Sequence, residues 1–226
     1  MMNLRLPARI DPSQIKERVR LPLAIPVFSY LKDHCFEGKN IFPAVEILQR
    51  LAGSLHSYRP DAFIRSMRFA SFDRLLLVEG DDHIVNVYNE LEIYENGRIS
   101  SRLITEGPIK GTKITRTKVH AVVDFATEEE LAAVPPVDMA AALEGICCKI
   151  PSQRLYDELV PFGPSYHNVT GDIYLSESGG MGQVYSACLP APSEPLGSPF
   201  PLDGAFHIAC AWGQKFHHIV AFPVGF

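Results

Sequence analysis

The sequence predicts an α+β fold made of two halves, each with antiparallel strands and one largely buried helix. Apolar residues recur every three or four positions over 43–55, which indicates an amphipathic helix. Alternating apolar residues over 85–93 and 119–125 indicate half-buried strands. A second apolar run over 202–216 indicates another core helix, and strand-like segments precede it. The order of elements is therefore similar in the two halves.

In the first half, we expect 1–30 to be only partly regular, because it contains several prolines and arginines. Pro43 suits the first turn of the helix, where a backbone N–H has no intrahelical partner. Asn96-Gly97 lies between two apolar segments and predicts a tight hairpin. The strands of this half are expected over 63–78, 85–93, 98–105 and 119–125.

The stretch 127–150 is acidic, contains two adjacent prolines and is predicted to link the halves. The first half is then 1–126 and the second half 151–226. The second half is predicted to contain, in order, a helix over 152–159, a turn at 162–164, a strand over 168–175, a turn at Gly179-Gly180, a strand over 183–189 and the helix over 202–216.

Composition limits the classes of function that fit. With 226 residues and 46% hydrophobic residues, the chain can bury the core of one large or two small domains. A net charge of -5 argues against a nucleic acid as partner. No apolar run is long enough to span a membrane, and the N-terminus lacks an apolar signal core. Five cysteines without Cys-x-x-Cys spacing indicate reduced thiols in a cytoplasmic protein.

The first candidate motif is His34-Cys-Phe-Glu-Gly38, followed at Pro43 by the predicted helix. The imidazole titrates near neutral pH. Gly38 permits a close approach of the backbone to a ligand. The helix would direct its free N–H groups and positive dipole end toward this loop, an arrangement that can hold a carbonyl oxygen as charge builds on it. A surface-loop histidine before an ordinary helix explains the same residues.

The second candidate motif is Asp203-Gly-Ala-Phe-His207. Residues four apart on a helix share a face, and an acidic residue suits the first helical turn. A capping carboxylate beside a packed histidine also explains this motif. Taken together, the two motifs predict an imidazole and a carboxyl group in one cleft. This acid/base pair suits removal of water from a 3-hydroxyacyl group.

Two other chemistries use the same residues. His34, Asp203 and His207 together could form a non-haem metal site, although Asp-x-x-x-His is not the usual spacing of such sites. Cys35, next to His34, could act as a nucleophile, although a cysteine is often simply buried. The acid/base interpretation needs neither, and we expect no metal.

These motifs resemble those of the dehydratase domain of polyketide synthases and of polyunsaturated fatty acid synthases. The matching residues are His34, Gly38 and Pro43 in the first motif, Pro199, Leu202, Asp203 and His207 in the second, and, in part, the turn Phe162-Gly163-Pro164 between them. The resemblance spans about residues 20–226. It implies a double hot dog fold, in which an antiparallel sheet wraps around a central helix in each half.

The resemblance also implies roles. His34 would be the base, Asp203 the acid, and His207 would orient one of the reacting groups. The remaining motif residues, Gly38, Pro43, Phe162, Gly163 and Pro164, would lie at the substrate. That substrate would be a 3-hydroxyacyl thioester on the phosphopantetheine of an acyl carrier protein, with no further cofactor. Other synthase domains are implied partners, and a homodimer is left open. The basic residues available to an acidic carrier are Arg18, Arg20, Lys110, Lys113 and Arg116.

The chain departs from the family pattern in three places. Phe162 replaces a tyrosine and Ser198 replaces a histidine. The chain ends at Phe226, about where the last strands of a second hot dog would begin, so we expect an incomplete second sheet and a longer native polypeptide. Freestanding fatty acid dehydratases look similar around the histidine, but they take their acid from a glutamate near the position of Gln49.

Three alternatives within this fold remain open at this stage. A product-template domain would steer an aldol cyclisation of a poly-keto chain, and a wide, deep pocket would favour it. A non-catalytic hot dog would bind acyl groups without turnover, and the loss of the tyrosine hydroxyl at Phe162 is consistent with that. Thioester hydrolysis is the third alternative.

Overall fold

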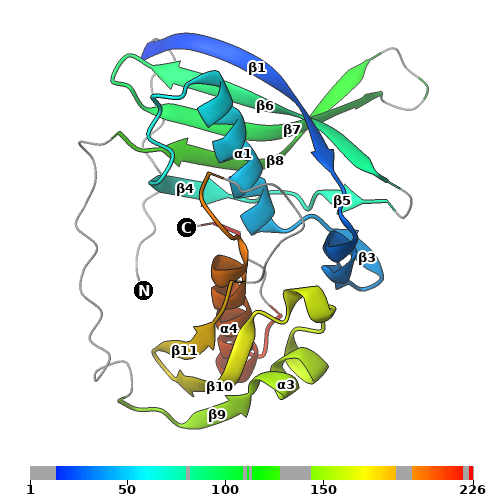
Figure 1. Cartoon of the computed structure of the whole chain (residues 1–226), viewed down its shortest axis with the longest axis vertical. Helices are drawn as coiled ribbons and strands as arrows, with labels where there is room; N and C mark the ends of the chain where they lie inside the picture. The colour runs from blue at the N-terminus through cyan, green and yellow to red at the C-terminus, as the bar shows by residue number, and fades with distance from the viewer. Residues whose placement is uncertain are drawn as a thin grey trace.

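Two antiparallel sheets, each packed against one helix, occupy the upper and lower parts of the molecule in Figure 1. The structure, a computed structural model, describes residues 14–79, 82–108, 111, 114–127, 144–186, 195–220 and 224–225. The larger sheet has the strand order β1-β6-β7-β8-β4, and the smaller has β11-β10-β9. A small third sheet has the order β2-β3-β5. This arrangement confirms the predicted α+β class.

The elements of the first half are β1 (Ile15–Pro26), η2 (Ser29–Asp33), β2 (Cys35–Phe36), β3 (Lys39–Ile41), α1 (Ala44–Tyr58), β4 (Met67–Ser71), β5 (Leu77–Val78), β6 (Ile84–Tyr94), β7 (Ile99–Pro108) and β8 (Thr115–Phe125). Those of the second half are β9 (Cys148–Pro151), α3 (Ser152–Arg154), η4 (Leu155–Leu159), η5 (Pro164–Tyr166), β10 (Val169–Ser176), β11 (Gly179–Val184) and α4 (Phe200–His217).

The segment 1–30, predicted to be only partly regular, contains one long strand that the sequence analysis did not identify. β1 is a strand of 12 residues that pairs antiparallel with β6, and its side chains alternate between more and less exposed positions. Pro22 lies opposite Tyr88 within this pairing. A proline is tolerated there because β1 is an edge strand, which needs hydrogen bonds on one side only.

Helix α1 lies against the large sheet and supplies the centre of the first core (Figure 1). Pro43 caps the helix rather than lying inside its first turn, one residue from the predicted position. Leu51, Ala52 and Leu55 are fully buried on its inner face, as the periodicity predicted. The predicted hairpin at Asn96-Gly97 is confirmed, with Gly97 at a φ of 83° that suits glycine.

The strand predicted over 63–78 divides into β4 and the two-residue β5. The intervening residues 72–76 leave the sheet and form one wall of a cavity. The backbone of Phe42 donates a hydrogen bond to the carbonyl of Leu76 at 2.8 Å, which holds this wall against the start of α1. A continuous strand would have placed these side chains on the sheet instead.

In the second half, three glycines allow α4 to approach the small sheet closely. A Cβ on Gly180 or Gly182 would lie 2.9 or 2.8 Å from the side chain of Ile208, and a Cβ on Gly204 would lie 2.9 Å from Val184. The turn predicted at Gly179-Gly180 is displaced by two residues in the structure. Both residues belong to β11, and the turn lies just before them, at 177–178.

Some predictions concern residues outside the described ranges. Residues 128–143 of the predicted linker and 187–189 of the predicted strand 183–189 are among them. Within the linker range, β9 begins at Cys148. The division into 1–126 and 151–226 stays a prediction. Near the end of the chain, Gly225 pairs with Ser71 of β4, and the backbone of Phe72 donates to the carbonyl of Val224 at 3.0 Å.

Candidate active site

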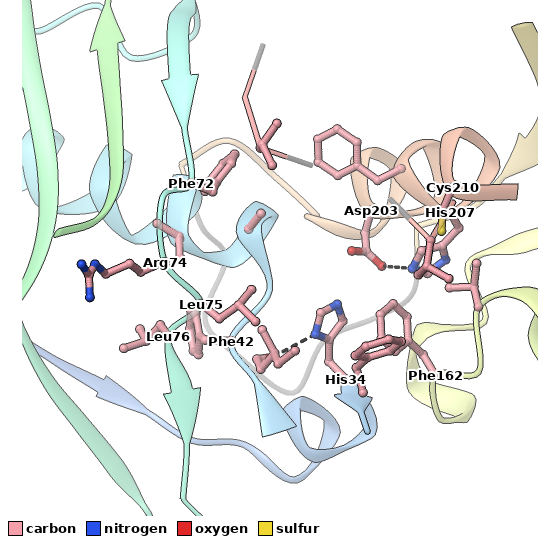
Figure 2. A pocket seen from close by; sticks show the side chains of 18 of the residues that line it. His34, Phe42, Phe72, Arg74, Leu75, Leu76, Phe162, Asp203, His207 and Cys210 are labelled. Atoms are coloured by element: carbon pink, nitrogen blue, oxygen red, sulfur yellow. Dashed lines mark hydrogen bonds and ion pairs between the residues drawn. The ribbon is translucent and has the colours of Figure 1, made fainter. Parts of the chain in front are cut away.

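His34 lies between η2 and β2, and its ring faces a cavity between the two halves (Figure 2). Its Nδ1 is 2.9 Å from the carbonyl oxygen of Ile41. A carbonyl oxygen only accepts hydrogen bonds, so Nδ1 carries the hydrogen of the neutral ring. Nε2 is then unprotonated, and it is the nitrogen that points into the cavity (Figure 2). The neutral ring is thus oriented to accept a proton.

Burial lowers the pKa of His34, because the apolar surroundings disfavour the imidazolium. The charge of Asp203 and the Ile41 carbonyl act in the opposite direction without overcoming this effect. The residue is 8% exposed. His34 is therefore neutral at pH 7, as a base must be before it accepts a proton.

Asp203 and His207 lie one turn apart on α4, and both are buried. The Oδ2 atom of Asp203 is 3.0 Å from Nε2 of His207, a contact that is short but poorly aligned for a hydrogen bond. The side-chain amide of Asn168 donates to the same oxygen at 3.3 Å. The other carboxyl oxygen of Asp203 points away from His207, toward the side on which His34 lies (Figure 2).

The cavity has a volume of about 260 Å³ and is lined mainly by apolar side chains from both halves. His34, Asp203 and His207 all line it, so the structure brings the two sequence motifs together. Phe42 and Leu75 from the first half and Phe206 from α4 supply apolar surface. An apolar, water-poor cavity strengthens interactions between charged and polar groups inside it.

Phe162 is the motif residue that joins the two halves. Its ring stacks on His34 with centroids 4.1 Å apart and lies 5.3 Å from the ring of His207. The backbone N–H of Gly163 donates to the carbonyl of Asp33 at 2.7 Å, and the N–H of Ser165 donates to the Asp33 carboxylate at 3.0 Å. Asp33 thus anchors the turn that holds Phe162 against the histidine.

The other predicted substrate residues do not line this cavity. Gly38 is exposed at the hairpin between β2 and β3, where its φ of 73° explains the glycine. Pro43 lies between the lining residues Phe42 and Ala44. Gly163 and Pro164 are behind Phe162, in the turn anchored by Asp33. These four residues lie in or beside loops that carry lining residues.

Four residues of the site were not singled out from the sequence: Asp33, Tyr156, Tyr166 and Asn168. Tyr166 packs edge-on to His34 at 5.0 Å, and Asn168 is fully buried beside Asp203. Asp33 is next to His34 in the sequence and Tyr166 follows the 162–164 turn, but their contacts across the two halves come from tertiary packing, which no spacing predicts.

The alternative chemistries find less support. Cys35 is half-buried on β2 and is not among the residues that line the cavity. In the part of the chain that the structure describes, no three His, Cys, Asp or Glu side chains are placed to hold a metal ion.

Within that same part, no helix combines the length and apolar character needed to cross a membrane.

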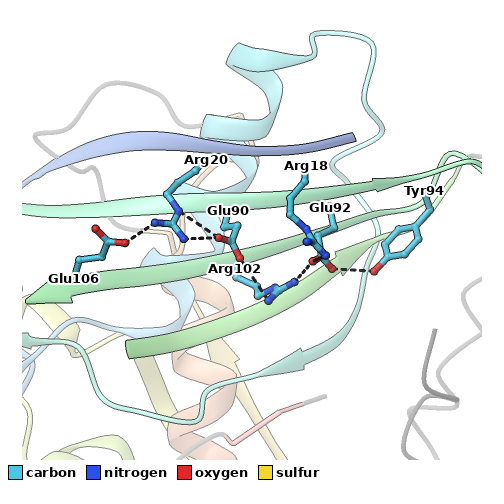
Figure 3. A network of polar contacts seen from close by, with 7 residues as sticks. All are labelled: Arg18, Arg20, Glu90, Glu92, Tyr94, Arg102 and Glu106. Atoms are coloured by element: carbon cyan, nitrogen blue, oxygen red, sulfur yellow. Dashed lines mark hydrogen bonds and ion pairs between the residues drawn. The ribbon is translucent and has the colours of Figure 1, made fainter. Parts of the chain in front are cut away.

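Of the three arginines expected to meet an acidic carrier, Arg18 and Arg20 are engaged in ion pairs on the outer face of the large sheet (Figure 3), and Arg116 is exposed on β8. Arg18 pairs with Glu92 at 2.8 Å, and Arg20 pairs with Glu90 at 2.7 Å and also with Glu106. Arg102 continues the network to Glu92 and Glu90. Acidic partners balance the charge, so Arg18 and Arg20 do not form a basic patch. Lys110 and Lys113 lie outside the described residues.

Comparison with known proteins identifies solved structures that share this fold. No protein-family model and no curated protein matches the chain. Solved structures do match: the dehydratase domain from the CurF module of the curacin polyketide synthase has a TM-score of 0.68 at 19% identity, covering 96% of this chain and 79% of that one. The dehydratase domain of a mycocerosic acid synthase-like polyketide synthase has a TM-score of 0.66 at 14% identity, covering 97% and 79%.

A third match is an inactive histidine-to-phenylalanine mutant of the CurK dehydratase, with a TM-score of 0.69 at 14% identity, covering 96% of this chain and 78% of that one. The chain therefore has the hot dog fold of polyketide synthase dehydratase domains, as the resemblance predicted. It spans about four-fifths of the length of these solved domains, at 79% for the CurF domain.

Proposed function

We propose that this chain dehydrates a 3-hydroxyacyl thioester, carried on the phosphopantetheine of an acyl carrier protein, to the 2,3-enoyl thioester. The observation that carries the proposal is the convergence of His34 from one half with Asp203 and His207 from the other on one apolar cavity. The dehydratase fold of the solved neighbours supports it. Other synthase domains and an acyl carrier protein are the partners that this function requires.

In the proposed reaction, Nε2 of neutral His34 removes a proton from C2 of the substrate. Electrons from the C–H bond form the C2=C3 double bond as the C3–O bond breaks. Protonated Asp203 gives its proton to the departing oxygen, which leaves as water. Each such acid/base contribution is worth roughly 100- to 10,000-fold in rate. The proton then passes from His34 back toward Asp203 to restore the starting state.

The thioester oxygen gains negative charge as C2 loses its proton. Ala44, the first residue of α1, lines the cavity, so the helix N-terminus faces the reaction site. Free N–H groups and the positive dipole end of a helix stabilise such charge. We therefore assign this role to the start of α1 rather than to the exposed Gly38.

The size of the cavity bears on the alternatives. At about 260 Å³, it lies just below the range of about 300–1,000 Å³ typical of small-molecule sites. This favours a short acyl group over the long poly-keto chain of a product-template reaction. A non-catalytic acyl-binding domain is the second candidate, because Phe162 lacks the hydroxyl that the family's tyrosine would bring to the cavity.

The test uses a 3-hydroxyacyl carrier protein as substrate and mass spectrometry of the carrier to detect the loss of one water. His34→Ala and Asp203→Asn should each remove turnover while circular dichroism and thermal unfolding show a folded protein. His56→Ala is the matched control, because His56 is exposed near the end of α1. Full turnover in either site variant would refute the assignment. Binding of acyl-pantetheine to the wild type without turnover would favour the acyl-binding alternative.

A further inference from the structure

Tyr156 lies behind His207, on the side away from the cavity lining. Its hydroxyl oxygen is 3.3 Å from Nδ1 of His207 and accepts the backbone N–H of Val169 at 2.8 Å. Its ring stacks on His167 with centroids 4.1 Å apart and planes within 10°. The side chain is buried and held on several sides, so the position of the hydroxyl is well defined.

The hydrogen bond from the N–H of Val169 decides which group donates in the hydrogen bond between Tyr156 and His207. A phenol hydroxyl has one hydrogen to donate and can accept through its oxygen. The N–H of Val169 can only donate, so it uses the oxygen as an acceptor. The hydroxyl hydrogen is then available for Nδ1 of His207, the nearby acceptor. Burial raises the pKa of Tyr156 well above its ordinary value, so this hydrogen is present at any working pH.

An Nδ1 atom that accepts a hydrogen bond leaves the hydrogen of the neutral ring on Nε2. That atom lies 3.0 Å from Oδ2 of Asp203, so an N–H group faces a carboxyl oxygen. The opposite tautomer would set a bare Nε2 against Oδ2. It would also place an Nδ1–H against the Tyr156 hydroxyl, which would lose its acceptor. The contacts of Tyr156 therefore favour one tautomer.

We propose that Tyr156 is a positioning residue that fixes His207 as the Nε2–H tautomer and thereby reserves Oδ2 of Asp203 as an acceptor. Asn168 donates to that same oxygen, so Oδ2 accepts one hydrogen bond and also faces the Nε2–H of His207 at 3.0 Å. The proton of the acid is then carried by the other oxygen, Oδ1, which points away from His207 (Figure 2). In the opposite tautomer, a proton on Oδ2 could be held by His207 and withheld from the substrate.

This assignment rests on the proposed function only in its consequence for turnover. The tautomer itself can be measured without substrate, on the whole chain labelled with ¹⁵N-histidine. Long-range ¹H–¹⁵N correlation spectra distinguish protonated from unprotonated ring nitrogens, and the spectrum of His207→Gln assigns the His207 signals. We expect Nε2–H for His207 and Nδ1–H for His34, whose Nδ1 donates to Ile41. Finding His207 as Nδ1–H in the wild type would overturn the proposal, whether or not the chain is a dehydratase.

The variant is Tyr156→Phe, which keeps the ring and removes only the hydroxyl. We expect the His207 signals to move toward the other tautomer and kcat to fall about tenfold or more, the rate equivalent of one hydrogen bond, with KM little changed. Tyr94→Phe is the matched control. Tyr94 is also buried and its hydroxyl bonds Glu92 at 3.1 Å, but it lies on the large sheet, so its loss should leave the spectrum and kcat unchanged.

A structural role for the hydroxyl predicts something different. If Tyr156 only stabilised the fold, Tyr156→Phe would lower the free energy of unfolding while the His207 signals stayed in place, and the proposal would fail. In a His207→Gln background, the amide has no tautomer to fix, so Tyr156→Phe should lose most of its effect on kcat. An equally large effect in that background would also contradict the proposal. An inactive wild type with the expected tautomer would refute the proposed function alone.

Discussion

Gly163→Ala tests how the two halves are held together at the site. Gly163 has φ -71° and ψ 169°, a conformation that alanine adopts without strain. The substitution matters because the new Cβ would lie 2.6 Å from Cγ of Asp33, about 0.8 Å short of the 3.4 Å at which ordinary contact begins. Glycine is therefore needed here for space, not for backbone freedom.

Asp33 cannot move away without losing bonds. Its carbonyl accepts the N–H of Gly163 and its carboxylate accepts the N–H of Ser165. Overpacking of this kind typically costs about 1–3 kcal/mol. We expect Gly163→Ala to lower the free energy of unfolding by about 2 kcal/mol. It should also lower kcat/KM, because the same turn holds Phe162 against His34.

Urea unfolding followed by the fluorescence of Trp212, the single tryptophan, measures the loss. Gly179→Ala is the matched control, because a Cβ there meets nothing within 4 Å, and its effect should stay within about 0.5 kcal/mol. Asp33→Gly removes all three atoms that the new Cβ would meet. The two substitutions should therefore couple in a double-mutant cycle. Additive effects, or an unaltered Gly163→Ala protein, would refute the steric explanation.

Three further predictions concern pH, core packing and the source of the acid. Because burial lowers the pKa of His34, kcat/KM should fall on the acid side with a midpoint below pH 6.5. A midpoint above pH 6.5 would contradict the assignment of His34 as the base. Leu51→Ala should destabilise the fold by about 2–5 kcal/mol in urea, since Leu51 is fully buried; a change below about 1 kcal/mol would contradict its core role. Gln49→Glu should not restore turnover to Asp203→Asn, because Gln49 binds the carbonyl of Gly197 and does not line the active-site cavity; restored turnover would show the opposite.

The pH dependence of stability follows from the same shift. The unfolded chain binds a proton on this histidine near pH 6.5, whereas folded His34 binds it only at lower pH. Its contribution to stability is therefore fully present above about pH 6.5 and is lost as the pH falls toward the lowered pKa. His120 has a pKa lowered by burial in the same direction, so His34→Gln should reduce this dependence without removing it.

The parts of the fold that were predicted correctly depend on local patterns. α1 follows from its apolar periodicity and the proline before it, and the β6–β7 hairpin follows from Asn96-Gly97. Local patterns failed where a distant side chain decides the outcome. Gly179 and Gly180 were predicted to form a turn, yet both lie in β11, and Gly180 is a glycine because Ile208 of α4 leaves no room for a Cβ there.

For the site, the sequence alone predicted the two side chains to which we assign acid/base chemistry: an imidazole at His34 and a carboxyl group at Asp203, each close to the start of a core helix. Only the tertiary structure decided how they are held. Asp33, Tyr156 and Asn168 reach the site through contacts between segments far apart in the chain, which no spacing encodes. Residue type sets what a group can do, whereas the pKa, tautomer and direction of that group depend on neighbours that packing alone brings near.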